Sequence, residues 1–127
     1  MFDNVKALGT ISALAKNKDK LAESAKRVRD ELERARVTGE SAGGVVRAVA
    51  SGDLRIISIE ISPALGAGIG ASDADRAMAC SLIADAVNDA LAKSRAKAQE
   101  AVRREADALG LPDISGDLGV SLGGLLR

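Results

Sequence analysis

The sequence predicts an α+β fold: a long N-terminal helix, a three-stranded antiparallel sheet and a long C-terminal helix, in that order along the chain. Three observations support this prediction. Residues 3–36 carry a sustained heptad pattern of apolar residues. Residues 37–61 change to short runs rich in Val and Ile, which glycines interrupt. Residues 72–109 return to a helical pattern, which begins at a capping sequence and ends before Gly110 and Pro112.

The length and composition of the chain predict one domain with an unusual core. The 127 residues are too few for two independent cores, and we assign the domain to residues 1–110. Residues 111–127 are rich in Gly and Leu, and we expect a loose tail there. Phe2 is the one aromatic residue, so few side chains can bury a large area. We therefore expect narrow helix seams and a core shared between subunits.

Several classes of protein are excluded by what the sequence lacks. One cysteine and no histidine rule out a disulfide framework and a zinc site. No catalytic constellation or cofactor motif is recognisable, so we predict a protein that is not an enzyme. We expect Cys80 to be a small buried residue, with a reactive thiol as the alternative. No signal segment or apolar run of the roughly 20 residues needed to span a membrane is present, which predicts a cytoplasmic protein.

The first helix carries one row of residues at alternating spacings of four and three, all but one of them apolar. The row consists of Ala7, Ile11, Leu14, Lys18, Leu21, Ala25, Val28, Leu32 and Ala35. Such a seam predicts a helix that packs lengthwise on another helix. Lys18 is the polar exception: it either sets the register of the two helices or extends its charged end into solvent where they separate.

Three segments between the helices have the composition of β-strands. They lie at about residues 36–41, 44–50 and 54–61. Pro63 ends the third strand because proline lacks the N–H donor that a continuing strand needs. Residues 64–71 match a loose form of the dinucleotide-binding fingerprint, but no further strand follows to complete a βαβ unit. We therefore expect a flexible linker at 64–71.

The second and third strands are predicted to form a hairpin. Gly52-Asp53 suits a two-residue turn, which sets Ser51 opposite Leu54. In this register one face of the hairpin collects most of the apolar side chains. They are Val46, Ala48, Ala50, Ile57, Ile59 and Ile61, with Ala48 opposite Ile57 and Val46 opposite Ile59. A shift by one residue would carry a strand's side chains to the opposite face, so the pattern favours this register.

The second helix begins at Ser72, whose spacing to Asp75 matches a capping box in acidic form. Its apolar stripe is broad at first and thin after Leu91. The stripe consists of Met78, Leu82, Ile83, Ala86, Val87, Ala90, Leu91, Ala98, Val102 and Leu109. We expect the first half to pack on the sheet and the second half to project and pack on a partner helix through its alanines. Asn88 and Asp89 are candidates to link helix and sheet.

Four short motifs carry a resemblance to a known family. They are Val37-Thr38-Gly39-Glu40, the glycines before the second strand, the Ile-x-Ile-x-Pro ending at Ile59, Ile61 and Pro63, and Asn88-Asp89-Ala90. In their order and spacing over about residues 20–110, they resemble the YbaB/EbfC family of bacterial nucleoid-associated DNA-binding proteins. The resemblance implies a homodimer in which the strands of two subunits join into a central sheet. Paired helices would then extend as arms about a DNA duplex, at the nucleoid in the cytoplasm.

The chain departs from the family pattern at three places. Met1 is the only Met in a region that is often rich in Met and Gln, Ser62 stands where many members have Asp, and residues 64–71 are neutral where an acidic loop is common. These differences concern how the protein meets DNA more than its fold. The resemblance implies no catalytic residue, and we expect neither a cofactor nor a metal.

The charge of the chain is balanced overall and uneven along its length. The first 36 residues hold nine basic and six acidic side chains, and the other 91 hold nine and twelve. This asymmetry is far below that of an evident nucleic-acid binder. The second helix adds a basic cluster on its outer half, at Lys93, Arg95, Lys97, Arg103 and Arg104.

A protein that neutralises DNA phosphates needs Lys or Arg repeated along a surface. On the first helix, Lys20, Arg27 and Arg34 are seven residues apart and lie on one stripe of the heptad. The candidate DNA-binding residues are Lys6, Lys20, Lys26, Arg27, Arg29, Arg34, Arg36, Lys93, Arg95 and Lys97. The alternative is a solvated face, whose cations pair with Glu23 and Asp30 within the helix.

We predict sequence-tolerant binding of double-stranded DNA by a homodimer, through contacts to the DNA backbone. The alternative function is a non-catalytic scaffold or adaptor whose helical arms bind a protein partner, which the zero net charge and the long apolar seam favour. An enzyme is the weakest of the three classes. We expect no membrane partner and no small-molecule substrate.

Overall fold

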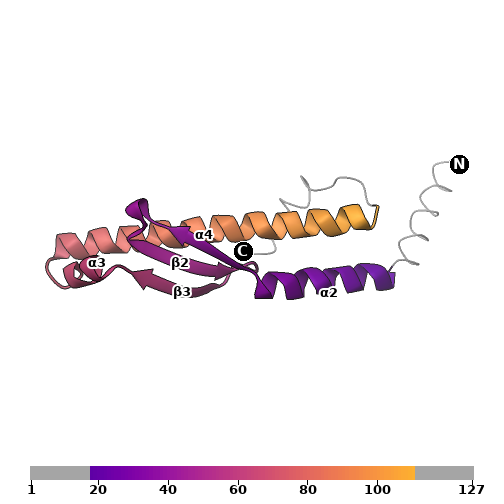
Figure 1. Cartoon of the computed structure of the whole chain (residues 1–127), viewed down its shortest axis with the longest axis horizontal. Coiled ribbons are helices and arrows are strands. Elements are labelled where there is room, and N and C mark those ends of the chain that lie inside the picture. The colour runs from indigo at the N-terminus through magenta and orange to yellow at the C-terminus, as the bar shows by residue number, and fades with distance from the viewer. Residues whose placement is uncertain (1–17, 111–127) are drawn as a thin grey trace, which may run out of the picture.

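The computed structural model describes residues 18–110. Its elements are α2 (Lys18–Arg34), β1 (Arg36–Glu40), a 3₁₀ turn (Ala42–Gly44), β2 (Val46–Ser51), β3 (Ile56–Ile61), α3 (Pro63–Gly68) and α4 (Asp73–Ala108). Figure 1 shows the strands beside the first half of α4 and α2 beside its second half. The predicted α+β architecture is confirmed. Within the described residues, no helix is long and apolar enough to cross a membrane.

The sheet is antiparallel with strand order β1-β2-β3, and α4 packs mainly on β1 and β2. Five small side chains form the buried centre: Val46, Ala48 and Ala50 from β2, and Ala86 and Ala90 from α4. Because these side chains are short, the helix axis lies close to the sheet. The chain has a single aromatic residue, so its core is built from small side chains.

β1 and α4 come closest at Gly39. A Cβ atom placed on Gly39 would lie 2.1 Å from the backbone nitrogen of Ala90 and 2.5 Å from the carbonyl oxygen of Ala86. Any side chain at this position would therefore push the helix away from the strand. Gly39 pairs with Ala48 on β2, so both strands present a minimal surface to α4.

The connection between β2 and β3 differs from the predicted two-residue turn. The Ser51 N–H donates to the carbonyl of Arg55 at 2.9 Å, so the loop contains the three residues 52–54. Leu54 adopts a left-handed backbone with φ of 66°, as the last residue of such loops does. Ser94 on α4 holds this shape, because its hydroxyl accepts from the Leu54 N–H at 3.1 Å and donates to the Ser51 carbonyl at 2.6 Å. A contact from a distant helix thus selects the turn.

The hairpin register is shifted by two residues from the predicted one. The longer loop accounts for one residue, and a β-bulge between Val49 and Ala50 accounts for the other. Ala48 therefore lies opposite Ile59 and not opposite Ile57. Because side chains alternate between faces, a shift of two leaves Ile59 on its predicted face. The predicted pairing is wrong, while the predicted face of Ala48 and Ile59 is right.

The apolar face of the hairpin is buried on β2 and open on β3. All six residues of β3 are exposed, including Ile57 at 49%, Ile59 at 43% and Ile61 at 37%. These isoleucines lie beyond the area that α4 covers, because the helix crosses β1 and β2. In a single chain, β3 therefore leaves this apolar face open to solvent.

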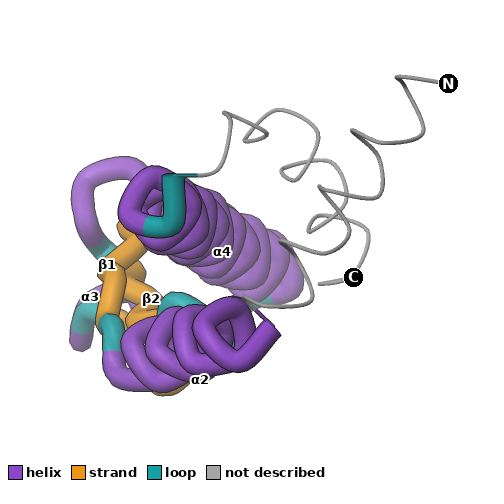
Figure 2. Tube along the Cα trace, turned by 90° about the vertical axis from the view of Figure 1, so that its right-hand side faces the viewer, coloured by secondary structure: helices purple, strands orange, loops and turns teal. Residues whose placement is uncertain are grey.

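α2 lies alongside the outer half of α4 (Figure 2). Four residues of the predicted seam are half-buried, as expected: Leu21, Val28, Leu32 and Ala35. Ser24, however, is buried where Ala25 was predicted, and Ala25 is exposed. On α4 the buried residues at this level are Ala98 and Ala101, so small side chains again allow a close approach. The predicted alanine seam of the outer half is confirmed, and Lys18 is exposed. The earlier part of the predicted N-terminal helix, residues 3–17, lies outside the described residues.

The segment after β3 is a short helix and not the expected flexible linker. Ser62 caps this helix, since its hydroxyl accepts from the Leu65 N–H at 3.3 Å, and Pro63 occupies the first helical position. α4 begins as predicted, with the Ser72 hydroxyl accepting from the Asp75 N–H at 3.0 Å. Local capping chemistry therefore accounts for both helix starts.

The two ends of α4 confirm one prediction and correct another. Gly110 follows the helix with φ of 70°, which is the predicted left-handed cap. Cys80, which was expected to be buried, is exposed, and so is Met78 of the predicted apolar stripe. Both lie in the first turns of α4, which run past the strands beside α3 (Figure 1). The predicted tail, residues 111–127, lies outside the described residues.

Candidate nucleic-acid interface

α2 and the outer half of α4 form a two-helix arm that extends away from the sheet (Figure 1). We define the arm as α2 together with residues 94–108. α2 runs toward the sheet and α4 runs away from it, so the two helices are antiparallel. Most of the predicted DNA-binding residues lie on this arm. Arg36 and Lys93 lie at its base, and Lys6 lies outside the described residues.

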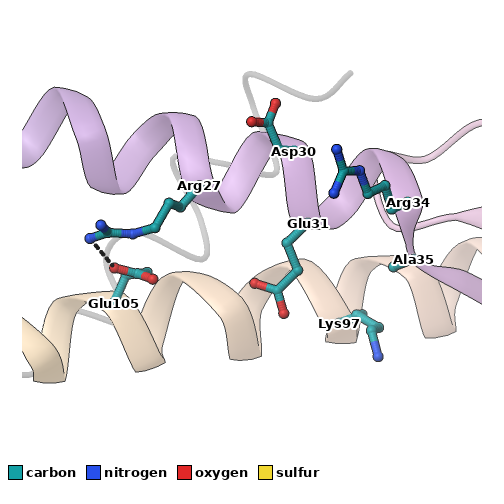
Figure 3. A pocket seen from close by; sticks show the side chains of 7 residues that line it. All are labelled: Arg27, Asp30, Glu31, Arg34, Ala35, Lys97 and Glu105. Carbon is teal, nitrogen blue, oxygen red and sulfur yellow. Dashed lines mark hydrogen bonds and ion pairs between the residues drawn. The ribbon is translucent and has the colours of Figure 1, made fainter.

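An open groove of about 690 Å³ separates the two helices of the arm on one side (Figure 3). It is lined by Arg27, Asp30, Glu31, Arg34, Ala35, Lys97 and Glu105. Three of these side chains are basic and three are acidic, so the groove carries no net charge. The groove by itself is therefore not an electropositive phosphate site.

Two arginines of the arm form ion pairs between α2 and α4. The guanidinium of Arg27 lies 3.4 Å from the carboxylate of Glu105 and also donates to the hydroxyl of Ser24 at 3.1 Å. Arg104 pairs with Glu31, and the hydrogen bond and charge of this carboxylate raise the pKa of the Arg104 guanidinium above its ordinary value. Both ion pairs join α2 to α4.

The alternative of pairing within the first helix is not what the structure shows. In the described part of the chain, no ion pair joins two residues of α2. Glu23 and Asp30 were the expected partners of the basic stripe, and neither forms an ion pair with any residue in the range 18–110. The carboxylates that do engage arginines of the arm are Glu31 and Glu105. Which arginine each one reaches depends on how the helices cross, which no short sequence pattern reports.

The basic residues of α2 are spread around the helix. Successive residues of an α-helix turn by about 100°, so Lys20, Arg27 and Arg34 stay within about 40° of one another and share the groove side. Lys26 and Arg29 lie about 100° and about 160° away from Arg27. The predicted stripe is therefore one of several basic faces of the arm, and not a single continuous patch.

Arg36 has a structural role at the end of α2. Its guanidinium donates to the carbonyl of Glu33 at 2.8 Å and to that of Ala35 at 2.9 Å. The last carbonyls of a helix lack partners within the helix and carry partial negative charge, so an arginine there stabilises the terminus. This arrangement makes Arg36 a helix cap more than a free cation.

Lys93 and Asp89 bind the outer edge of β1. The Asp89 carboxylate accepts from the Glu40 backbone N–H at 3.0 Å, and the Lys93 ammonium donates to the Thr38 carbonyl at 3.0 Å. The two side chains also pair with each other at 3.1 Å. The Glu40 hydrogen bond, with the help of Lys93, holds the pKa of Asp89 below its ordinary value. Asp89 therefore links helix and sheet as anticipated, while Lys93 is engaged by the strand.

The remaining candidates are exposed and form no ion pair within the described residues. They are Lys20, Lys26, Arg29, Arg34, Arg95 and Lys97. The described part of the chain also contains no group of three or more acidic, Cys or His side chains that could hold a metal ion. What the arm offers chemically is a set of cations at several angles around two helices.

Comparison with known proteins decides the family. The model of the YbaB/EbfC DNA-binding family matches residues 8–109. The chain belongs to this family. A nucleoid-associated protein of Trichormus variabilis is 36% identical over 109 residues, which cover 83% of this chain and 89% of that protein. A nucleoid-associated protein of Xanthomonas campestris pv. campestris is 31% identical over 104 residues, covering 82% and 92%.

A solved structure supports the fold of this YbaB/EbfC chain. An uncharacterized protein from Helicobacter pylori superposes with a TM-score of 0.52 at 16% identity, covering 65% of this chain and 89% of the other. In the present structure the two most specific family motifs meet: Gly39 lies against Ala90, and the Glu40 N–H binds Asp89. These motif residues join β1 to α4. They build the fold.

Proposed function

We propose that this chain binds double-stranded DNA as a homodimer at the nucleoid, through phosphates and without reading base sequence. One observation carries the proposal: exposed cations that form no ion pair with a described residue surround the arm. They are Lys18, Lys20, Lys26, Arg29, Arg34, Arg95, Lys97 and Arg103. Membership of a DNA-binding family and the names of the nucleoid-associated relatives support it.

The physical basis of this binding is counterion release. Each Lys or Arg that contacts a phosphate frees condensed cations from the duplex, and this gain is independent of the bases. Because the whole chain carries equal numbers of basic and acidic residues, the attraction must come from the arm and will weaken steeply as salt rises. Cations on several faces of the arm suit contact with two strands of a duplex more than insertion of one helix face into a groove.

The homodimer is proposed to form through β3. This strand is one edge of the sheet, and its exposed isoleucines form an apolar surface that water would otherwise cover. Antiparallel pairing of β3 with β3 of a second copy across a twofold axis would join the sheets and bring Ile59 and Ile61 of the two copies together. The apolar core that a single chain leaves open on β3 would then be completed by its partner.

The opposite edge of the sheet favours the same choice. On β1, the backbone N–H of Glu40 and the carbonyl of Thr38 are already bonded to Asp89 and Lys93 of α4. An edge strand whose outward groups are bonded by side chains is a poor site for another strand. β3 is therefore the edge available for pairing.

The DNA hypothesis is tested by titrating the full chain into fluorescent duplexes of random sequence at several salt concentrations. We expect binding at low salt and a linear fall of log K with log salt. Arg34→Gln and Lys97→Gln should each reduce the slope by about 0.9 per chain, or about 1.8 for the homodimer. Arg47→Gln is the control, because it removes the same charge from the sheet, where Arg47 pairs with Glu40 at 3.1 Å. Its slope should equal that of the wild type.

Four results would count against different parts of this proposal. Absence of binding at low salt would overturn the function, whereas unchanged slopes for both arm variants would overturn only the assignment of residues. A strong preference for one duplex sequence would contradict sequence-tolerant binding. Capture of a protein partner that survives nuclease, with no DNA binding, would favour the adaptor.

The dimer is tested by light scattering coupled to size exclusion. The wild type should have the mass of two chains, and Ile59→Asp should have the mass of one, because it places a charge in the proposed apolar contact. Ser58→Asp is the matched control: Ser58 is adjacent and exposed, and it pairs with Val49 on the opposite face of the sheet. A monomeric wild type, or an Ile59→Asp variant that remains dimeric, would overturn the β3 interface.

A further inference from the structure

Two of the arginines best placed to meet DNA are occupied by carboxylates of the same arm. The side chain of Arg27 is 62% exposed, whereas that of its partner Glu105 is 20% exposed. Arg104 is likewise more exposed than its partner Glu31. In each pair the guanidinium lies on the solvent side and the carboxylate lies deeper between the helices. A phosphate approaching from solvent would reach the arginine first.

We propose that Glu31 and Glu105 limit the DNA affinity of the arm by competing with phosphate for Arg104 and Arg27. Carboxylates and phosphates bind a guanidinium through the same fork of N–H donors, so each contact with DNA at these arginines must displace an internal partner. This inference rests on the proposed DNA-binding function and deepens it. The acidic residues set how much of the arm's positive charge DNA can use.

The arrangement of the pairs explains why competition is the expected outcome. Each pair joins α2 to α4, so the packing of the two helices brings the carboxylate close to its arginine. The guanidinium of each pair is open to solvent, and ion pairs that water can reach contribute little to folding. Their removal should therefore change DNA binding more than it changes the stability of the protein.

The test neutralises the carboxylates and keeps their size. Glu31→Gln and Glu105→Gln, alone and combined, are compared with the wild-type chain in the salt-dependent duplex titration, and thermal unfolding is recorded for each. Glu23→Gln is the matched control, because Glu23 lies on α2, is exposed and forms no ion pair within the described residues. We expect each of the first two substitutions to steepen the salt slope by about 0.9 per chain, or about 1.8 for the homodimer, and to raise affinity on the order of a hundredfold near 50 mM salt. The control should leave the slope unchanged.

Removal of the freed arginine separates competition from a loosened arm. Adding Arg27→Gln to Glu105→Gln should return the slope to that of the wild type, whereas a gain caused by looser helices would persist. The proposal is overturned if the Glu31 and Glu105 variants match the Glu23→Gln control or bind more weakly. If the wild type and all variants fail to bind at low salt, the proposed function and this inference both fail. If only the combined Glu31→Gln and Glu105→Gln variant binds DNA, the result would contradict only the proposed function of the wild-type chain.

Discussion

Replacement of Gly39 by alanine tests the closest contact in the fold. The added methyl group would meet three backbone atoms of α4: the nitrogen of Ala90 at 2.1 Å, the carbonyl oxygen of Ala86 at 2.5 Å and the Cα of Ala90 at 2.6 Å. Ordinary contact begins at 3.4 Å, so strand and helix must separate by about 1.3 Å. Backbone atoms cannot move aside by changing a rotamer. The whole of this part of α4 must shift.

The energetic cost follows from what that shift disturbs. Overpacking of a well-filled core costs about 1–3 kcal/mol, and a clash with backbone belongs at the upper end. The same movement would lengthen the hydrogen bond from the Glu40 N–H to Asp89, now 3.0 Å. We therefore expect Gly39→Ala to lower the free energy of unfolding by about 3 kcal/mol. Hydrogen exchange of the Glu40 amide should also accelerate.

The assay is urea unfolding followed by circular dichroism, with all variants at one protein concentration because a dimer's stability depends on concentration. Two other glycines give a graded comparison. A Cβ on Gly52 would lie 2.9 Å from the Leu32 side chain and 3.0 Å from the Leu32 carbonyl oxygen, looser contacts than those at Gly39, so Gly52→Ala should cost about 1–2 kcal/mol. Gly66 lies in α3 with nothing within 4 Å, so Gly66→Ala should be neutral or stabilising by about 0.5 kcal/mol.

The order of stability of the three variants tests whether β1 and α4 approach as closely as the structure shows. If Gly39→Ala is as stable as Gly66→Ala, α4 does not lie as close to β1 as the structure shows. If Gly52→Ala is the most destabilised of the three, the tightest contact is between α2 and the hairpin loop. In both cases the reasoning about the close approach would be refuted.

Three further substitutions probe the hydrogen bonds that position the helices. Ser94→Ala should cost about 2 kcal/mol in urea unfolding, because it leaves the buried polar groups of Ser51 and Leu54 without a partner; unchanged stability would contradict the role of this hydroxyl. Asp89 has a lowered pKa in the folded state, so its stabilising effect is present above about pH 4 and is lost as pH falls through the folded pKa. Asp89→Asn should therefore flatten acid unfolding curves below about pH 4, and identical curves would count against this link. Arg36→Ala should lower stability by about 0.5 kcal/mol through loss of the helix cap and leave the salt slope of DNA binding unchanged, whereas a reduced slope would show that it contacts DNA.

The basic residues show most plainly where sequence reasoning ends. Composition and spacing identify which Lys and Arg belong to the two helices, and Lys20, Arg27 and Arg34 do share one side of α2 as their spacing predicts. The sequence does not reveal that Arg27 is paired with Glu105 and that Arg36 caps a helix. Partners at such separations are brought together by the way the helices cross.

The sequence by itself determined the features that depend on neighbouring residues. The order of helices and strands, the cap at Ser72, the left-handed Gly110 and the alternation that places Val46 and Ala48 on one face all follow from local periodicity and turn chemistry. The tertiary structure decided the features that depend on distant contacts. Ser94 selects a three-residue loop, a bulge then completes the two-residue shift in register, and α4 covers β2 but leaves β3 open. The physical reason is that a side chain influences the backbone conformation of only a few neighbouring residues. The strand register, the identity of the uncovered edge strand and the ion pairs between helices are determined only when separate elements pack together.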